Sequence, residues 1–220
     1  MTAIKERIRA ERLGQGDPLP SENALALEFG VSRAVVREAF RSLAALKLID
    51  IGNGRRARVS AIDPAVLGLV LDHAIHTNQI TIQQIYDVRR TIEMRTVALA
   101  ALRRGDDEAA AILALAEAMA RDFAIPARVM EHDIAFHEAV ARASRNPLFA
   151  LVVGSFHIVT RQTWGIGWTS RANDAERMAS VACHGAIARA VSERDPRAAG
   201  AAMADHFDLS VKALLAAGIN

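Results

Sequence analysis

The chain has 220 residues, 51% of them hydrophobic and 24% charged, with a formal net charge of +2. This length allows one small and one medium domain, each with its own core. No apolar run approaches a membrane span, and residues 1–12 alternate charged with short apolar side chains, so we expect no membrane anchor and no signal peptide. The lone Cys183 excludes an intrachain disulfide framework, as is typical of cytoplasmic proteins.

The first 60 residues are basic. Residues 1–60 contain 11 Lys and Arg against 7 Asp and Glu, a net charge of +4. Residues 61–220 contain 16 against 18, a net charge of −2. The modest net charge of the whole chain therefore hides a basic N-terminal part, which a surface in contact with phosphate requires.

Residues 19–59 predict a winged helix-turn-helix. Ser21 favours a helix start because serine is a preferred N-cap, and Gly30 favours the left-handed position that ends the helix. Ser32 then caps a second helix with a buried apolar face. Two short β-type runs joined by a Gly-Asn-Gly turn follow, at residues 48–51 and 57–59.

The second helix has an exposed basic stripe, because Arg33, Arg37 and Arg41 are four residues apart. The first two lie in the N-terminal half, which reaches base edges and phosphates when such a helix enters the major groove. A charged stripe is often only a solvated face, but the basic balance of this part favours DNA binding. Further arginines follow the turn, where a wing meets the phosphate backbone: Arg55, Arg56 and Arg58.

These motifs resemble the DNA-binding domain of the GntR family, whose pattern is LPSE, a VSR-x-x-VREA recognition helix and a glycine-containing wing. LPSE begins at Leu19, VSR at Val31 and VREA at Val36. The chain departs from the pattern at Asn23, where members often have a DNA-contacting arginine, and its segment before Leu19 is shorter than the usual first helix. The resemblance implies operator contacts by Ser32, Arg33, Arg37, Asn53, Gly54 and Arg55.

From about Ile62 the sequence is almost continuously helical. Asp63 can cap a helix and Pro64 suits its first position. We predict helices at 64–77, 81–104, 106–122, 126–144, 147–169, 173–193 and 196–217. The fold class is therefore mainly α, with a winged domain at 1–60, a linker helix at 61–77, and a bundle of six or seven antiparallel helices that ends at residue 220. Such bundles build ligand sites from side chains that face inward.

Four polar side chains occupy positions where these helices should be apolar. Asp133 and His137 lie one turn apart on the buried stripe of helix 126–144, and His184 and His206 lie on the stripes of the last two helices. Burying them is costly unless they are paired or bound to a metal. A lone buried histidine is usually a hydrogen-bonded core residue, but four such groups favour a metal site. Their donors suit Zn²⁺, with Ni²⁺ or Mn²⁺ as alternatives.

Residues 133–147 and 184–206 resemble the metal-binding type of FCD effector domain, the C-terminal half of the FadR branch of GntR regulators. Its metal ligands match the four residues above in order and approximate spacing. Acyl-CoA-binding members lack this set, so that ligand class is disfavoured. The resemblance implies a homodimer on a double-stranded operator with an inverted repeat, and an effector-binding and dimerisation domain at 78–220.

The chemistry of such a site predicts an acidic effector. A dication with one aspartate and three neutral histidines keeps a net charge of +1, and an octahedral shell leaves positions open for a small organic acid. By resemblance, Arg89 would bind the carboxylate, with Arg90 as the alternative because neighbours cannot both face inward. We expect Arg161, Trp164 and Trp168 to line the pocket, although packing explains the two tryptophans equally well.

We therefore predict a metabolite-responsive regulator, in which effector binding releases a repressor from DNA. One alternative is a metal-dependent hydrolase with an added DNA-binding domain. It is disfavoured because no HExxH segment occurs, and neither Glu131 nor Glu138 falls on the Asp133/His137 face. A second alternative is a structural metal without a sensing role. His132 should face away from the site, and His73, His76 and His157 are assigned structural or surface roles.

Overall fold

The computed structural model describes residues 1–52 and 55–219, so the predicted wing-tip residues Asn53 and Gly54 lie outside the described residues. The chain divides into two compact units, Met1–Val66 and Leu67–Asn220. The fold is mainly α, with a two-stranded wing in the first unit and a helical bundle in the second. The predicted fold class is confirmed.

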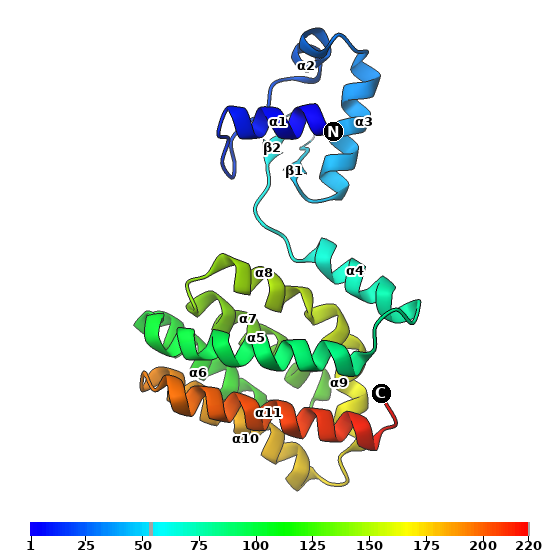
Figure 1. The fold of residues 1–220 in the computed structure, drawn as a ribbon. Coiled ribbons are helices and arrows are strands. Elements are labelled where there is room, and N and C mark those ends of the chain that lie inside the picture. Colours follow the sequence, from blue (N-terminus) through cyan, green and yellow to red (C-terminus); the bar gives the residue numbers. More distant parts are fainter. Residues whose placement is uncertain (53–54, 220) are drawn as a thin grey trace. The chain divides into compact units, whose positions relative to one another are not determined.

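The first unit is a winged helix-turn-helix built by local capping (Figure 1). The side chains of Ser21 and Ser32 each accept a backbone N–H bond at the start of a helix, and Gly30 ends the first of these at φ +65°. Leucine and phenylalanine side chains from these helices fill the core together with Ile4. The elements of the unit are α1 (Thr2–Ala10), α2 (Glu22–Phe29), α3 (Arg33–Ala45), β1 (Ile49–Asp50) and β2 (Arg58–Val59).

The two strands are antiparallel, with Ile49 opposite Val59, and are shorter than the predicted runs at 48–51 and 57–59. The reason is that residues 57–59 also bond to the segment before α2. Leu19 N–H donates to the Ala57 carbonyl, and Val59 N–H donates to the Asp17 carbonyl. The second run thus divides its backbone bonds between two neighbours.

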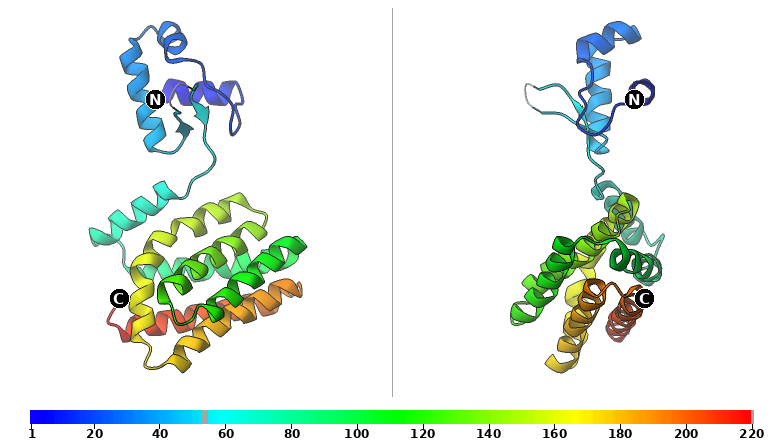
Figure 2. Two further views of the ribbon diagram at one scale, coloured as in Figure 1. Left: turned by 180° about the vertical axis from the view of Figure 1, so that it is seen from behind. Right: turned by 90° about the vertical axis from the view of Figure 1, so that its left-hand side faces the viewer.

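The second unit is a bundle in which α11 packs against α5, α9 and α10, while α6 packs against α7 and α10 (Figures 1 and 2). Proline in the first turn begins three helices, and a Thr81–Gln84 capping box begins α5. None of the described helices is long and apolar enough to cross a membrane. The elements are α4 (Ala65–His76), α5 (Ile82–Arg103), α6 (Asp106–Arg121), α7 (Pro126–Ala143), α8 (Pro147–Ser155), α9 (His157–Ser170), α10 (Asp174–Ser192) and α11 (Pro196–Ala216).

The single helix predicted at 147–169 is wrong, because the chain breaks at Phe156 into α8 and α9. Phe156 N–H bonds to the Val153 carbonyl, one residue short of the α-helical partner. On either side, Ser155 Oγ and His157 Nδ1 bond to carbonyls of the preceding turn. Such side-chain bonds compete with the helical ladder and bend it. The break sets the direction of α9, which lines the site described below.

Two glycines in this unit provide a test of the packing. Gly200 in α11 has nothing within 4 Å of where a Cβ would lie, whereas a Cβ at Gly68 in α4 would lie 3.2 Å from the Ser155 carbonyl oxygen. We expect Gly200→Ala to raise the free energy of unfolding by about 0.5–1 kcal/mol, because alanine costs less backbone entropy in a helix. Gly68→Ala should give no such stabilisation, because the new methyl group would press against the Ser155 carbonyl oxygen.

Urea unfolding followed by tryptophan fluorescence checks this, because both tryptophans lie in the second unit. Equal stabilisation by the two substitutions would contradict the packing of α4 against the α8–α9 junction.

Candidate metal centre and nucleic-acid interface

The structure brings together the four polar residues that the sequence singled out. Asp133 and His137 come from α7, His184 from α10 and His206 from α11. One potential ligand atom from each lies within 4.8 Å of the others, and all four side chains are buried. The helical spacing of Asp133 and His137 places both on one face of α7, where the other two helices meet them.

The histidine rings present bare nitrogen atoms to this cluster. His137 Nδ1 donates to Glu93 Oε2 at 2.5 Å, and His184 Nδ1 donates to the Ser180 carbonyl at 3.1 Å. Among the described residues, the Nε2 atoms of both rings and Nδ1 of His206 are buried without a hydrogen-bond partner. Such atoms are costly in a core unless something binds them.

The spacing of the Asp133 and His184 donors fits a divalent ion. His184 Nε2 lies 2.8 Å from Asp133 Oδ1, yet the pair is not aligned as a hydrogen bond. Two donors at right angles, each about 2.1 Å from one ion, would lie about 3.0 Å apart. The residues present therefore fit a metal with nitrogen and oxygen ligands.

The charge states of Asp133 and His206 also suit metal binding. Burial alone would raise the pKa of Asp133, but the nearby rings of His184, His137 and His206 lower it. Burial and the facing rings of His184 and His137 hold the pKa of His206 well below its ordinary value. An ionised carboxylate and a neutral imidazole are the forms that bind a metal.

Glu93 is a candidate functional residue that the sequence analysis missed. Its carboxylate is 2% exposed, accepts from His137, and also accepts from Arg89 Nε at 3.0 Å. Burial would raise the pKa of Glu93, but His137 and Arg89 lower it, so the group is ionised. A carboxylate behind a ligand histidine fixes the ring and raises its basicity. The available signal was the four-residue spacing of Arg89 and Glu93 on the inward stripe of α5.

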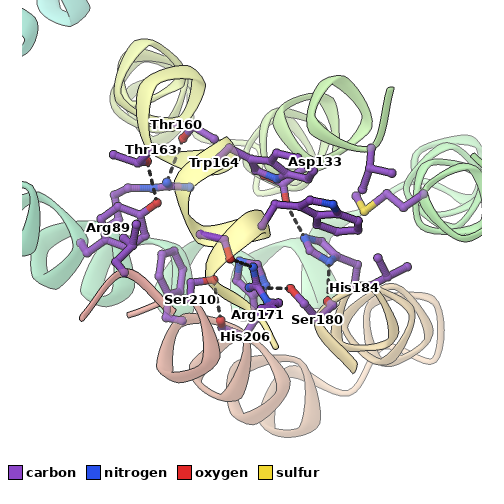
Figure 3. A pocket seen from close by; sticks show the side chains of 18 residues that line it. Arg89, Asp133, Thr160, Thr163, Trp164, Arg171, Ser180, His184, His206 and Ser210 are labelled. Atoms are coloured by element: carbon purple, nitrogen blue, oxygen red, sulfur yellow. Dashed lines mark hydrogen bonds and ion pairs between the residues drawn. The ribbon is translucent and has the colours of Figure 1, made fainter. Parts of the chain in front are cut away.

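A cavity of about 50 Å³ adjoins the cluster (Figure 3). Asp133, His184 and His206 form part of its wall, and three residues expected to line it do so: Arg89, Trp164 and Trp168. The two tryptophan rings are stacked with centroids 4.8 Å apart.

Arg161, which was expected to line the cavity, does not. It is half exposed and forms a two-pronged ion pair with Glu131 outside the cavity. The reason is helical geometry, because Thr160 faces the cavity and the next residue points about 100° away. Arg90 likewise lies outside the cavity, paired with Asp208.

Arg171 does line the cavity, and sequence reasoning missed it. It follows the last residue of α9, beyond the reach of the helical pattern used to choose inward positions.

His132 faces away from the cluster, as predicted, and its Nε2 lies 2.8 Å from Asp122. Glu131 and Glu138 pair with arginines at the surface, at Arg161 and Arg142 respectively.

The basic stripe of α3 is exposed, as predicted. Ser32 uses its hydroxyl to cap α3, and Arg33 Nε donates to Glu22 Oε2 at 3.0 Å. Arg37 and Arg55 are exposed. An exposed pair such as Arg33–Glu22 is weak, so phosphate or a base edge can replace the glutamate.

Comparison with known proteins gives two family matches. Residues 1–59 match the model described as bacterial regulatory proteins, gntR family, and residues 84–209 match the FCD domain. The chain belongs to the GntR family. It is a DNA-binding transcriptional regulator with an FCD domain, in the FadR-like subfamily. The hydrolase alternative is therefore not supported, since these are regulators and not enzymes.

Individual relatives resemble the GntR-family chain along most of its length. The HTH-type transcriptional repressor NanR of Cronobacter sakazakii is 29% identical over 214 residues, covering 93% of this chain and 80% of that protein. NanR of Salmonella typhimurium is also 29% identical, covering 93% and 79%. The solved structure of a Streptococcus agalactiae GntR protein is 26% identical, covers 96% of both chains and has a TM-score of 0.68.

Substitution of a metal-cluster residue, or of Glu93 behind it, should weaken metal binding. We expect chelator-treated protein to bind one Zn²⁺ or Ni²⁺ per chain in isothermal titration calorimetry. Glu93→Gln should weaken binding about 10- to 100-fold because the outer carboxylate loses its charge. Asp133→Ala should weaken it further, because a ligand is lost.

His132→Gln is the matched control for this experiment, since His132 neighbours Asp133 in sequence but faces Asp122. Binding by Asp133→Ala with the affinity of the unmodified protein would show that the cluster does not hold the ion.

Substitution of the α3 arginines should weaken DNA binding. With a duplex selected from a random pool by the unmodified protein, Arg33→Ala and Arg37→Ala should each cost about 1–3 kcal/mol in fluorescence anisotropy. Arg142→Ala, on the exposed face of α7, is the control and should bind normally. Unchanged affinity of both α3 variants would exclude this helix as the reading element.

Proposed function

We propose that this GntR-family protein is a repressor that leaves its operator when a small carboxylate binds beside a divalent ion. The supporting observation is a cluster of four buried side chains beside a cavity: Asp133, His137, His184 and His206. Each of the three histidines has a buried ring nitrogen without a hydrogen-bond partner among the described residues. Zn²⁺ is the proposed ion, and Ni²⁺ and Mn²⁺ suit the same donors.

The proposed ligand follows from charge. A dication with one carboxylate and three neutral imidazoles keeps a net charge of +1, so the centre attracts an anion. When bound, the ion would supply open coordination positions to an oxygen of that anion. The protein contributes the cavity, its hydroxyl and guanidinium groups, and the exclusion of bulk water.

On DNA, we propose a homodimer on an inverted repeat, because one winged domain reads one half-site and two-fold symmetry supplies the second. The protein would act in the cytoplasm, where bacterial DNA lies. The acid releases the operator only if it binds the two arrangements of the dimer with different affinity. Ligand contacts on α9, α10 and α11 give it a means to do so, since these helices surround the cavity.

A purely structural ion remains a second candidate, because the four residues are buried within the bundle core. Chelation distinguishes the two roles. A structural ion would leave the second unit unfolded when removed, whereas a sensing ion would leave it folded but unresponsive to acid.

A thermal-shift screen of short organic acids tests the proposal. At a concentration about 100 times its Kd, a ligand stabilises the folded state by about 2.7 kcal/mol, or roughly 5–10 °C for a protein of this size. We expect such a shift with at least one acid on zinc-loaded protein, and none with the corresponding amide.

Asp133→Ala and His184→Ala should not respond to that acid. The sensing role fails if no acid shifts the melting temperature, or if these variants respond as the unmodified protein does.

A further inference from the structure

Two arginines in the cavity wall have opposite electrostatic surroundings. Arg89 is almost fully buried, and its charge is balanced by Glu93, with Nε and Oε1 3.0 Å apart. Its Nη1 donates to Thr160 Oγ1 at 2.9 Å. Aromatic rings at 5.3–5.8 Å from its guanidinium carbon fix it further: those of Tyr86, Phe156 and Phe207. This guanidinium is already neutralised and held by the protein.

Arg171 has no such partner. Its Nη2 donates to Ser180 Oγ at 3.1 Å, and its Nη1 donates to the Gly167 carbonyl. In the described part of the chain, no carboxylate oxygen lies within ion-pair distance of this guanidinium. Burial lowers the pKa of Arg171, although the more distant Asp133 and Tyr86 oppose this. A partly buried cation whose own hydrogen bonds go only to neutral acceptors favours an incoming anion.

The backbone that carries Arg171 is fixed in place. Arg177, one turn into α10, donates through Nε to the Trp168 carbonyl and through Nη2 to the Arg171 carbonyl, both at 3.1 Å. These bonds hold the turn between α9 and α10. The guanidinium is therefore positioned before any ligand arrives, which reduces the entropy lost on binding.

The surroundings of Arg171 define the ligand's size and polarity. Figure 3 shows Arg171 beside Ser180, on the side of the cavity where His184 lies, while Arg89 lies next to Thr160 and Thr163. The cavity volume of about 50 Å³ corresponds to roughly three to five water-sized groups. This space suits a small acid of roughly two or three carbon atoms better than a bulky sugar acid or a long acyl chain.

We propose that Arg171, and not Arg89, binds the effector's carboxylate, with Ser180 as the neighbouring hydroxyl, and that the effector is a short carboxylic or hydroxycarboxylic acid. This assignment rests on the proposed acid-sensing function. The guanidinium donates to the carboxylate in a two-pronged geometry, and Glu93 keeps Arg89 in its structural position. The ligand thereby joins the end of α9 to α10, the helix that carries His184.

Titration of zinc-loaded, full-length protein with acetate, glycolate, lactate and malate tests the assignment. Binding is followed by calorimetry and by tryptophan fluorescence, since Trp164 and Trp168 line the cavity. Arg171→Gln should weaken binding of the tightest of these acids at least about 10-fold, the usual loss with a charged hydrogen bond. Arg171→Lys should bind with intermediate affinity, because it keeps the charge but not the planar fork.

Arg161→Gln is the matched control, because Arg161 also lies on α9 but pairs with Glu131 outside the cavity. Its acid affinity should equal that of the unmodified protein. Each variant is first shown to bind one Zn²⁺, which confirms that the metal centre is intact.

The possible outcomes separate the two proposals. Arg171→Gln and Arg171→Lys binding within twofold of the unmodified protein, while Asp133→Ala binds no acid, would overturn the Arg171 assignment and leave the sensing function standing. Failure of the unmodified, zinc-loaded protein to bind any of the four acids would overturn both.

Discussion

At the centre of the helical bundle, a carboxylate and three imidazoles share a volume from which water is largely excluded. Their mutual arrangement is expensive for a metal-free protein, because three buried ring nitrogens have no hydrogen-bond partner among the described residues. A divalent ion would remove that cost by occupying the point toward which the four side chains converge. The same ion would hold α7, α10 and α11 together, since each helix supplies at least one ligand.

Two groups of residues surround this cluster, and they differ in their charge balance. On the α5 side, Glu93 orients His137 and neutralises Arg89, which leaves a closed and internally balanced network. Toward the α9–α10 turn, Arg171 is a positioned cation without a counter-ion among the described residues. The first arrangement stabilises the site, and the second underlies the proposed binding of an anion. A ligand that contacts both the ion and Arg171 would change the relative positions of the helices that hold the ion.

Sequence reasoning succeeded where the chemistry is local or periodic. The serine caps and Gly30 define the helix-turn-helix, and the four-residue spacing of Asp133 and His137 places both on one helix face. The sequence was not sufficient where tertiary contacts determine a helix break or the burial of a charged side chain. The break at Phe156 depends on side-chain bonds to carbonyls, and a charged residue such as Glu93 can be buried only because two helices bring it partners. Arg171 follows a helix end, where periodicity gives no direction, and Arg161 shows how one step along a helix moves a side chain out of a site.

If the proposed mechanism holds, operator affinity depends on the acid through the metal centre. The most direct test measures the dissociation constant of the full-length protein for its selected operator in four conditions, with and without zinc and with and without the tightest-binding acid. We expect acid to weaken DNA binding about 5- to 150-fold when zinc is present, the usual range of allosteric coupling, and to have no effect on chelated protein. An identical effect of acid with and without zinc, or no effect in either condition, would contradict the proposed mechanism.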